Sequence, residues 1–320
     1  MQTIADVASR FTALRQELDR VIIGQERVKM LAIASLVAGG HMLLEGAPGT
    51  GKTLLSLALA RLLGCRFRRI QFTPDLMPAD LLGANIFNQK SQEFAFRPGP
   101  VFTDVLLADE INRTPPRTQA ALLEAMQENA VTLDGTRYAV SPVFTVFATQ
   151  NPVEFEGTYP LPEAQRDRFL FKISIDFPEA ADEEKMLSAY AGGERLHDQI
   201  VKSLKPVITA AELAQARITV ASLVRVEPHI IKYIQEIVAR TRHDDAVQIG
   251  AGPRASLALL EASRAVAALG SRSFITPDDV KSLVEPVLAH RVTLSPDAEM
   301  EGLALSDILS RIYEQVEVPR

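Results

Sequence analysis

Apolar residues recur in two different rhythms along this chain. Between Ile4 and Val21 they return every three or four positions, which predicts an amphipathic helix. A second helix is predicted from about Glu26 to Val37, after a break at Gly24-Gln25. Short apolar runs typical of buried strands follow at residues 41–45, 67–72, 105–109, 144–149 and 170–175. Buried strands that alternate with helices form parallel sheets covered on both faces, so the pattern predicts an α/β fold.

The pattern changes after Pro178. From there onward helices follow one another without a further strong strand signal, and helix starts are indicated at Thr209, Pro228 and Thr276. We therefore predict an αβα core over residues 1–178, followed by an all-helical domain over residues 179–320.

Two short hairpins are predicted inside the first domain. Strands at 131–133 and 138–140 flank Asp134-Gly135, which is a strong signal for a tight turn. A second alternating pair lies between Gly83 and Gly99, within the segment 74–100, which opens with a short helix near Pro78. Both hairpins are interpreted as insertions in a standard core.

Composition narrows the class of protein. Apolar residues make up 47% of the chain and charged residues 23%, which is ordinary for a globular protein. The net charge of −6 disfavours nucleic acid as a partner, because such proteins normally present a basic face. The local cluster of Arg66, Arg68 and Arg69 is interpreted as a solvated edge or a subunit contact.

Location is inferred from cysteine usage and hydropathy. Cys65 is the only cysteine, so no internal disulfide can form and a reducing compartment is expected. The first residues lack the basic start and apolar block of a secretion signal. The longest apolar stretch, residues 30–44, is shorter than a bilayer span. We expect a cytoplasmic protein with no membrane insertion.

The strongest chemical signal is a glycine-rich loop between the strand at 41–45 and a helix expected from Leu54 to Leu63. It fits the phosphate-binding pattern G-x-x-x-x-G-K-[ST] and consists of Gly46, Ala47, Pro48, Gly49, Thr50, Gly51, Lys52 and Thr53. The backbone N–H groups of such a loop, together with the helix N-terminus, bind phosphate. Lys52 is expected to reach the β- and γ-phosphates, and Thr53 to hold Mg²⁺.

A second signal is the pair of carboxylates that ends the strand at 105–109. Successive side chains of a strand point to opposite faces, so Asp109 and Glu110 are predicted to do different work. Asp109 is expected to ligate Mg²⁺ directly or through water. Glu110 is expected to polarise the water that attacks the γ-phosphate.

Ordered motifs along the chain carry a resemblance to a known family. They occupy residues 21–25, 46–53, 106–113, 122–128, 148–152, 161–169 and 252–255. Taken together, these blocks resemble those of the MoxR family of AAA+ ATPases. The resemblance implies a P-loop AAA+ core with an insert in its second helix, here residues 74–100, and a helical lid.

The resemblance also implies roles for individual residues. Gly24 and Gln25 match the place where the adenine is seated, and Asn151 matches sensor 1, which positions the attacking water. Arg168 matches the arginine finger that enters the neighbouring site, with Arg166 as the competing candidate. Arg254 matches sensor 2, which links the lid to the nucleotide. Each role has a competing interpretation. Gly24 could simply end a helix, and Asn151 could belong to an Asn-Pro turn. The finger candidates could be surface arginines, and Arg254 could form a structural ion pair.

At the level of function, the resemblance implies a homo-hexameric ring with ATP at each subunit boundary. It implies remodelling or maturation of protein clients, including metalloenzymes, with a separate adaptor that carries a von Willebrand factor A domain. Phe87, Phe94 or Phe96 of the insert is a candidate contact to the client, unless these rings pack on their own subunit. The alternatives are a chelatase-like motor subunit, whose partner inserts a metal into a tetrapyrrole, and a nucleic-acid motor.

Overall fold

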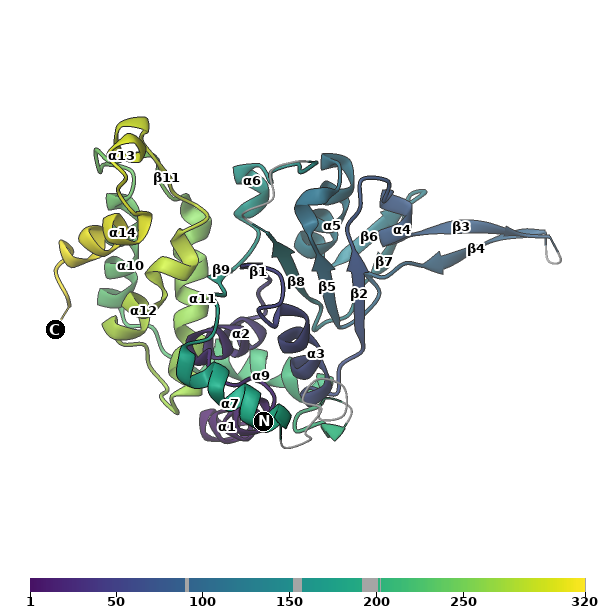
Figure 1. The fold of residues 1–320 in the computed structure, drawn as a ribbon, viewed down its shortest axis with the longest axis horizontal. Coiled ribbons are helices and arrows are strands. Elements are labelled where there is room, and N and C mark those ends of the chain that lie inside the picture. The colour runs from purple at the N-terminus through teal and green to yellow at the C-terminus, as the bar shows by residue number, and fades with distance from the viewer. Residues whose placement is uncertain (90–91, 152–156, 192–200, 202, 320) are drawn as a thin grey trace.

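The computed structural model describes residues 1–89, 92–151, 157–191, 201 and 203–319. Its centre is a five-stranded sheet in the order β2-β5-β8-β1-β9, in which every neighbouring pair is parallel (Figure 1). The strands are β1 (Met42–Glu45), β2 (Phe67–Gln71), β5 (Val105–Asp109), β8 (Thr145–Gln150) and β9 (Phe171–Ser174). Each coincides, within a residue or two at its ends, with an apolar run of the sequence, so the predicted parallel sheet is confirmed.

Both faces of the sheet are buried. Leu44 and Leu107 point to one face, where α1 (Ile4–Asp19), α2 (Glu26–Ala38) and α3 (Lys52–Leu62) pack. Leu43 and Leu106 point to the other face, where α4 (Pro78–Leu82) and α5 (Pro116–Glu128) pack. Because both sets of side chains are shielded from water, the central strands β1, β5 and β8 read as continuous apolar runs rather than as alternating ones. The edge strand β2 differs, since Arg68 and Arg69 on it are exposed.

The C-terminal part is helical with one exception. Its helices are α7 (Ala180–Ala191), α9 (Ala210–Leu223), α10 (Pro228–Arg240), α11 (Pro253–Leu269), α12 (Pro277–Leu288), α13 (Pro296–Met300) and α14 (Leu305–Glu314). The all-helical prediction is wrong in one detail, because β10 (Val247–Ile249) and β11 (Thr293–Leu294) form a short antiparallel pair. Strands this short leave no readable alternation in the sequence. Over the described ranges, no helix combines the length and apolar character that a bilayer crossing needs.

Helix α9, in the C-terminal part, packs on the core rather than apart from it. Arg217 of α9 donates from Nε to the carbonyl of Leu36, at 2.9 Å, and from Nη2 to Oγ1 of Thr145, at 3.0 Å. Burial lowers the pKa of this guanidinium to about 10. Helices α9 and α11 share one apolar cluster with α1 and α2. A domain boundary near residue 178 remains a prediction.

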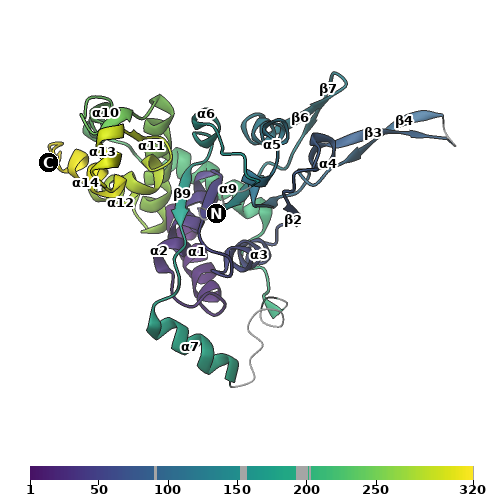
Figure 2. The ribbon, with the colours of Figure 1, turned by 45° about the horizontal axis from the view of Figure 1, so that its top comes forward.

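The two predicted hairpins are confirmed and project from the same side of the core, away from the lid (Figures 1 and 2). One pairs β3 (Gly83–Asn88) with β4 (Glu93–Pro98), and the other pairs β6 (Ala130–Leu133) with β7 (Thr136–Ala139). Asp134 and Gly135 have φ values of +49° and +77°, the left-handed conformation that a two-residue hairpin turn requires.

Candidate functional site

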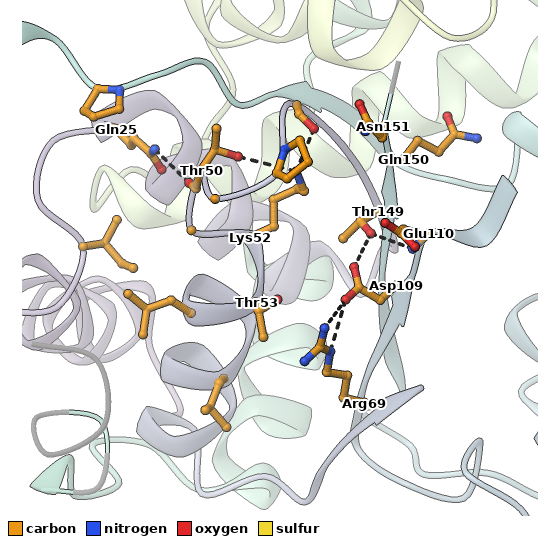
Figure 3. Close-up of a pocket in the computed structure, with 18 of the residues that line it drawn as sticks. Gln25, Thr50, Lys52, Thr53, Arg69, Asp109, Glu110, Thr149, Gln150 and Asn151 are labelled. Carbon is orange, nitrogen blue, oxygen red and sulfur yellow. Dashed lines mark hydrogen bonds and ion pairs between the residues drawn. The ribbon is translucent and has the colours of Figure 1, made fainter. Parts of the chain in front are cut away.

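A cavity of about 580 Å³ opens where β1, β5 and β8 end (Figure 3). This volume lies in the usual range for a small-molecule site of about 300–1,000 Å³. The cavity is lined by Gly46, Pro48, Gly49, Thr50, Gly51, Lys52 and Thr53 of the glycine loop, by the carboxylates Asp109 and Glu110, and by Gln25 and Asn151. Most of the residues predicted for the site are therefore brought together.

The glycine loop connects β1 to α3 in the predicted order. Gly49 and Gly51 have φ values of +85° and +88°, a region that side chains rarely allow. A Cβ added at Gly46 would collide with the carbonyl oxygen of Ile175, because the loop runs close to the segment after β9. Gly51 is the N-cap of α3 and offers no side-chain cap, so the first N–H groups of this helix stay available to an anion.

Lys52 is the cation of the loop. Its Nζ donates to the carbonyl oxygens of Gly46, at 2.7 Å, and Ala47, at 2.8 Å. Burial lowers the pKa of Lys52, and the nearby carboxylates of Asp109 and Glu110 act in the opposite direction. Ala47 does not line the cavity, but its carbonyl holds both Lys52 and the hydroxyl of Thr50, at 3.0 Å.

Asp109 is fixed by residues from both neighbouring strands. Its Oδ2 accepts from Nε and Nη2 of Arg69, at 3.1 and 2.6 Å, and its Oδ1 accepts from the Thr149 hydroxyl, at 2.6 Å (Figure 3). Arg69 lies on the edge strand β2, as the interpretation of a solvated edge required, but its guanidinium lines the cavity. The sequence analysis missed this role, because nothing local in the sequence links β2 to the end of β5.

Glu110 lies directly after the last residue of β5. Its φ and ψ are +56° and +51°, a left-handed conformation that lets the chain turn from β5 into the short helix η1 (Ile111–Arg113). Glu110 therefore does not follow the alternation of the strand, and both its side chain and that of Asp109 line the cavity. The backbone N–H of Glu110 donates to Oγ1 of Thr149, at 2.8 Å. Non-glycine residues held in this conformation cost roughly 1–3 kcal/mol and are concentrated at functional sites.

The carboxylate of Glu110 has two partners. Nε2 of Gln71 donates to its Oε2, at 2.5 Å, and Nε of Arg113 lies 3.1 Å from the same oxygen. Gln71 ends the edge strand β2, and it too was missed by the sequence analysis. Asn151 lines the cavity directly after β8, is 9% exposed, and lies on the same side of the cavity as Glu110 (Figure 3). Pro152, the last residue of that predicted motif, lies outside the described residues.

The opposite end of the cavity is apolar. It is lined by Val21, Ile22, Ile23, Leu54, Leu57, Pro178 and Met186. Gln25, with φ +54°, donates from Nε2 to the Thr50 carbonyl at 3.3 Å and so joins this end to the glycine loop. Gly24 does not line the cavity, and it does not end α1, which stops at Asp19. Its φ is +68°, and an added Cβ would collide with the carboxylate of Asp182 on α7.

The three candidate arginines lie outside this cavity. Arg254, at the start of α11, forms an ion pair with Asp167, with Nη1 and Oδ2 3.7 Å apart. Arg166, the last residue of α6 (Glu163–Arg166), and Arg168, which lies between α6 and β9, flank that aspartate. The predicted sensor 2 and finger residues are thus next to one another, but none of them reaches the cavity of its own chain.

The donor set of the cavity fits a nucleotide with Mg²⁺. A phosphate-binding loop, one lysine and an uncapped helix N-terminus suit a polyphosphate, while the apolar end suits a base. Thr53 and Asp109 supply a hydroxyl and a carboxylate. Mg²⁺ bound to phosphates normally takes few protein ligands and keeps several waters. Among the described residues there is no group of three or more His, Cys, Asp or Glu side chains that could hold a metal ion.

Two family models match the chain. The model described as the ATPase family associated with various cellular activities (AAA) matches residues 41–171. The model described as the AAA lid domain matches residues 239–312. The first match contains the glycine loop and both carboxylates, and the second contains Arg254.

Individual proteins resemble the chain over nearly its full length. The Bacillus subtilis protein YeaC is 46% identical over 304 residues, which cover 95% of this chain and 93% of that one. The protein named Chaperone MoxR1 of Mycobacterium tuberculosis is 38% identical over 95% of this chain and 81% of that one. The crystal structure of a candidate ATPase from Cytophaga hutchinsonii has a TM-score of 0.90 and 35% identity, covering 99% and 97% of the two chains.

Proposed function

Since this chain belongs to the MoxR family of AAA+ ATPases, we propose that it hydrolyses ATP with Mg²⁺ in a homo-hexameric ring and uses the energy to remodel protein clients. The observation that carries the proposal is the convergence of Lys52, Asp109, Glu110 and Asn151 on one cavity with an apolar end. A nucleotide switch without turnover would not need a carboxylate held at the position of Glu110.

Each residue of the cavity has a role in this proposal. The loop amides and Lys52 bind the phosphates, and the apolar end with Gln25 receives the adenine. Thr53 and Asp109 hold Mg²⁺, which neutralises charge on the phosphates. Glu110 accepts the proton of the attacking water, and Asn151 orients that water. Arg69 keeps Asp109 in place through its two hydrogen bonds.

The ring is proposed because the site needs a further cation. Arg166 and Arg168 do not line their own cavity, and the described residues offer neither of them an ion pair. An arginine supplied by a neighbouring subunit would stabilise the charge that develops on the γ-phosphate. We assign Arg168 to this role, with Arg166 as the alternative, and Arg254 to a lid contact with the nucleotide.

The projecting hairpins are proposed to contact the client. Phe94 and Phe87 are 72% and 49% exposed, and their ring centroids lie 5.3 Å apart. Phe96 is different, because it stacks on Tyr138 of the other hairpin, with centroids 4.0 Å apart. The side chain of Asn85 also donates to Asp134, at 2.6 Å. Phe96 therefore joins the two hairpins, and Phe87 and Phe94 remain the candidates for contact with a partner.

The client and adaptor are proposals drawn from the family. The Mycobacterium tuberculosis relative is named a chaperone, and we propose a chaperone-like role here. We further propose that a separate protein with a von Willebrand factor A domain acts as adaptor, and that the clients include metalloenzymes under maturation. A pull-down in the presence of ATP that recovers no such adaptor would argue against this part.

The test is Mg²⁺-dependent ATP turnover per subunit across a dilution series. We expect the specific activity to rise with concentration, since each site would need two subunits. Glu110→Gln and Arg168→Ala are each expected to abolish most turnover while ATP binding is kept. Flat specific activity together with normal turnover in Arg168→Ala and Arg166→Ala would contradict the shared site. Phe94→Ala should leave basal turnover and thermal stability unchanged and impair only client remodelling.

A further inference from the structure

Asp167 joins the lid to the segment that carries both finger candidates. Its Oδ1 lies 2.7 Å from Nε of Arg291, just beyond the end of α12, and its Oδ2 lies 3.7 Å from Nη1 of Arg254 on α11. The neighbours of Asp167 in sequence are Arg166 and Arg168. Two arginines of the lid thus meet the finger segment at a single carboxylate, on the side of the core that faces the lid (Figures 1 and 2).

Arg291 holds this segment through its backbone as well. Its side chain is 4% exposed. Besides the carboxylate of Asp167, its guanidinium donates to the carbonyl oxygens of Asp167 (3.2 Å), Phe169 (2.6 Å), Leu170 (3.2 Å) and Val287. The neighbouring His290 donates from Nε2 to the Phe169 carbonyl, at 2.9 Å. A buried cation bonded to successive carbonyls fixes the path of the chain from Asp167 to Leu170.

Arg166 and Arg168, on either side of Asp167, differ from Arg291 in their hydrogen bonding. Both are half-buried, and the Nε atoms of both are buried without a hydrogen-bond partner among the described residues. Buried polar groups are normally hydrogen-bonded. Their chain is therefore held by the lid, while the Nε atoms of their guanidinium groups lack an acceptor among the described residues.

We infer that Asp167 and Arg291 are positioning residues that set the Arg166–Arg168 segment for the site of the neighbouring subunit. The inference rests on the shared site of the proposed function. Arg254 makes the link responsive to nucleotide: its ion pair with Asp167 is long, its side chain is 53% exposed, and it can exchange this partner for a phosphate. Nucleotide bound in one subunit would then change the position of the arginine that this subunit presents to the site of the next subunit.

Subunit mixing tests the inference, because a defect in the finger segment can be repaired by a neighbour. Asp167→Asn is close to isosteric and removes the charge that both lid arginines contact. Alone, it should lower turnover by about tenfold or more, as expected when a catalytic group is displaced by about 1 Å. Glu110→Gln alone should be inactive but retain an intact finger segment. In a random equimolar mixture, about a quarter of the sites combine an intact Glu110 with an intact finger segment, since head-to-tail ring interfaces draw on two different surfaces.

We expect this mixture to regain activity well above the mean of its components. Arg291→Lys keeps the charge but cannot reach all the carbonyls, and it should show the same rescue. Agreement between these two different substitutions would exclude misfolding of either variant as the cause of the defect. Asp244→Asn, which breaks the 2.8 Å ion pair with Arg311 elsewhere on the lid, is the matched control and should keep normal turnover.

The outcomes separate the inference from the proposed function. If Arg168→Ala or Arg166→Ala is rescued by Glu110→Gln but Asp167→Asn and Arg291→Lys are not, sites are shared and the positioning role is overturned. If no arginine variant is rescued, the shared site itself fails and the positioning role fails with it. Rescue of the arginine variant, of Asp167→Asn and of Arg291→Lys supports both.

Discussion

The Thr149 hydroxyl donates to Oδ1 of Asp109 at 2.6 Å and accepts from the backbone N–H of Glu110 at 2.8 Å. One hydroxyl on β8 thus holds the carboxylate that ends β5 and supports the left-handed turn that follows it. In the sequence, Thr149 lies within the motif at 148–152 and at the end of a buried strand, but no role was predicted for it.

We expect Thr149→Val to disturb both carboxylates at once. It leaves the Glu110 N–H without its acceptor, which costs about 1–3 kcal/mol. Turnover of ATP should fall by roughly 10- to 100-fold, equivalent to about 1.4–2.7 kcal/mol in the barrier. Thr149→Ser keeps the hydroxyl and should retain most activity. Steady-state turnover measures both, and a Thr149→Val protein with normal turnover would show that the bridge has no catalytic value.

Gln71 provides a second test, because its amide nitrogen donates to the Glu110 carboxylate at 2.5 Å. This bond occupies a lone pair of the carboxylate oxygen, which is then less available to accept a proton from the attacking water. We expect Gln71→Ala to raise client-free turnover by roughly two- to fivefold, the equivalent of one hydrogen bond of about 0.5–1 kcal/mol. The matched control is Gln92→Ala, in the loop of the β3–β4 hairpin. Lower turnover in Gln71→Ala would mean that the bond orients the base instead of restraining it.

Lys29 is a third test, directed at nucleotide binding. Its side chain is 1% exposed, pairs with Asp19 and Glu26, and donates to the Ile22 carbonyl at 3.2 Å. Ile22 lines the apolar end of the cavity. We expect Lys29→Met to loosen this loop and raise the KM for ATP by roughly three- to tenfold, or about 0.7–1.4 kcal/mol, with kcat nearly unchanged.

The control for Lys29 is Arg15→Met. Arg15 is the exposed partner of the same Glu26, at 2.6 Å, and exposed ion pairs contribute little. It should leave KM unchanged. If Lys29→Met lowers kcat while KM stays constant, Lys29 does not act through the nucleotide-binding loop.

Stability should depend on His41 in mildly acidic solution. His41 is buried, with Nδ1 accepting from the Val146 N–H at 3.0 Å and Nε2 bonded to the Met126 carbonyl at 3.3 Å. Burial lowers its pKa from about 6.5 to about 4. The unfolded chain therefore binds a proton that the folded chain refuses. The free energy of unfolding should decline as the pH falls from about 6.5 to about 4, by at most about 1.4 kcal/mol per pH unit for this group.

Denaturant titrations between pH 4.5 and 6.5 measure that slope. His41→Asn should flatten it, whereas His229→Asn, on an exposed position of α10, should not. The buried His290, whose pKa is also lowered by burial, contributes in the same direction and limits how flat the curve becomes. An unchanged slope in His41→Asn would assign the acid sensitivity to other groups.

Much of the site could be predicted because its parts are encoded locally. The apolar run before Gly46, the glycines and Lys52 are contiguous in sequence, and so are the apolar strand and the carboxylates of Asp109 and Glu110. The conformation of a few neighbouring residues fixes such units, and the predicted strand, loop and helix all form. The roles of Asn151 and of the candidate arginines were predicted from the family resemblance, and each of these residues also lies within a short motif.

By itself, then, the sequence determined the parallel sheet, the phosphate loop, the acidic strand end and the two hairpins, because periodicity and turn chemistry act over short distances. Only the tertiary structure decided that Arg69 and Gln71 reach the carboxylates about forty positions away. It also decided that Arg291 of the lid holds Asp167, across a separation of 124 positions. These contacts depend on the order of strands in the sheet and on the docking of the lid, which no local pattern specifies.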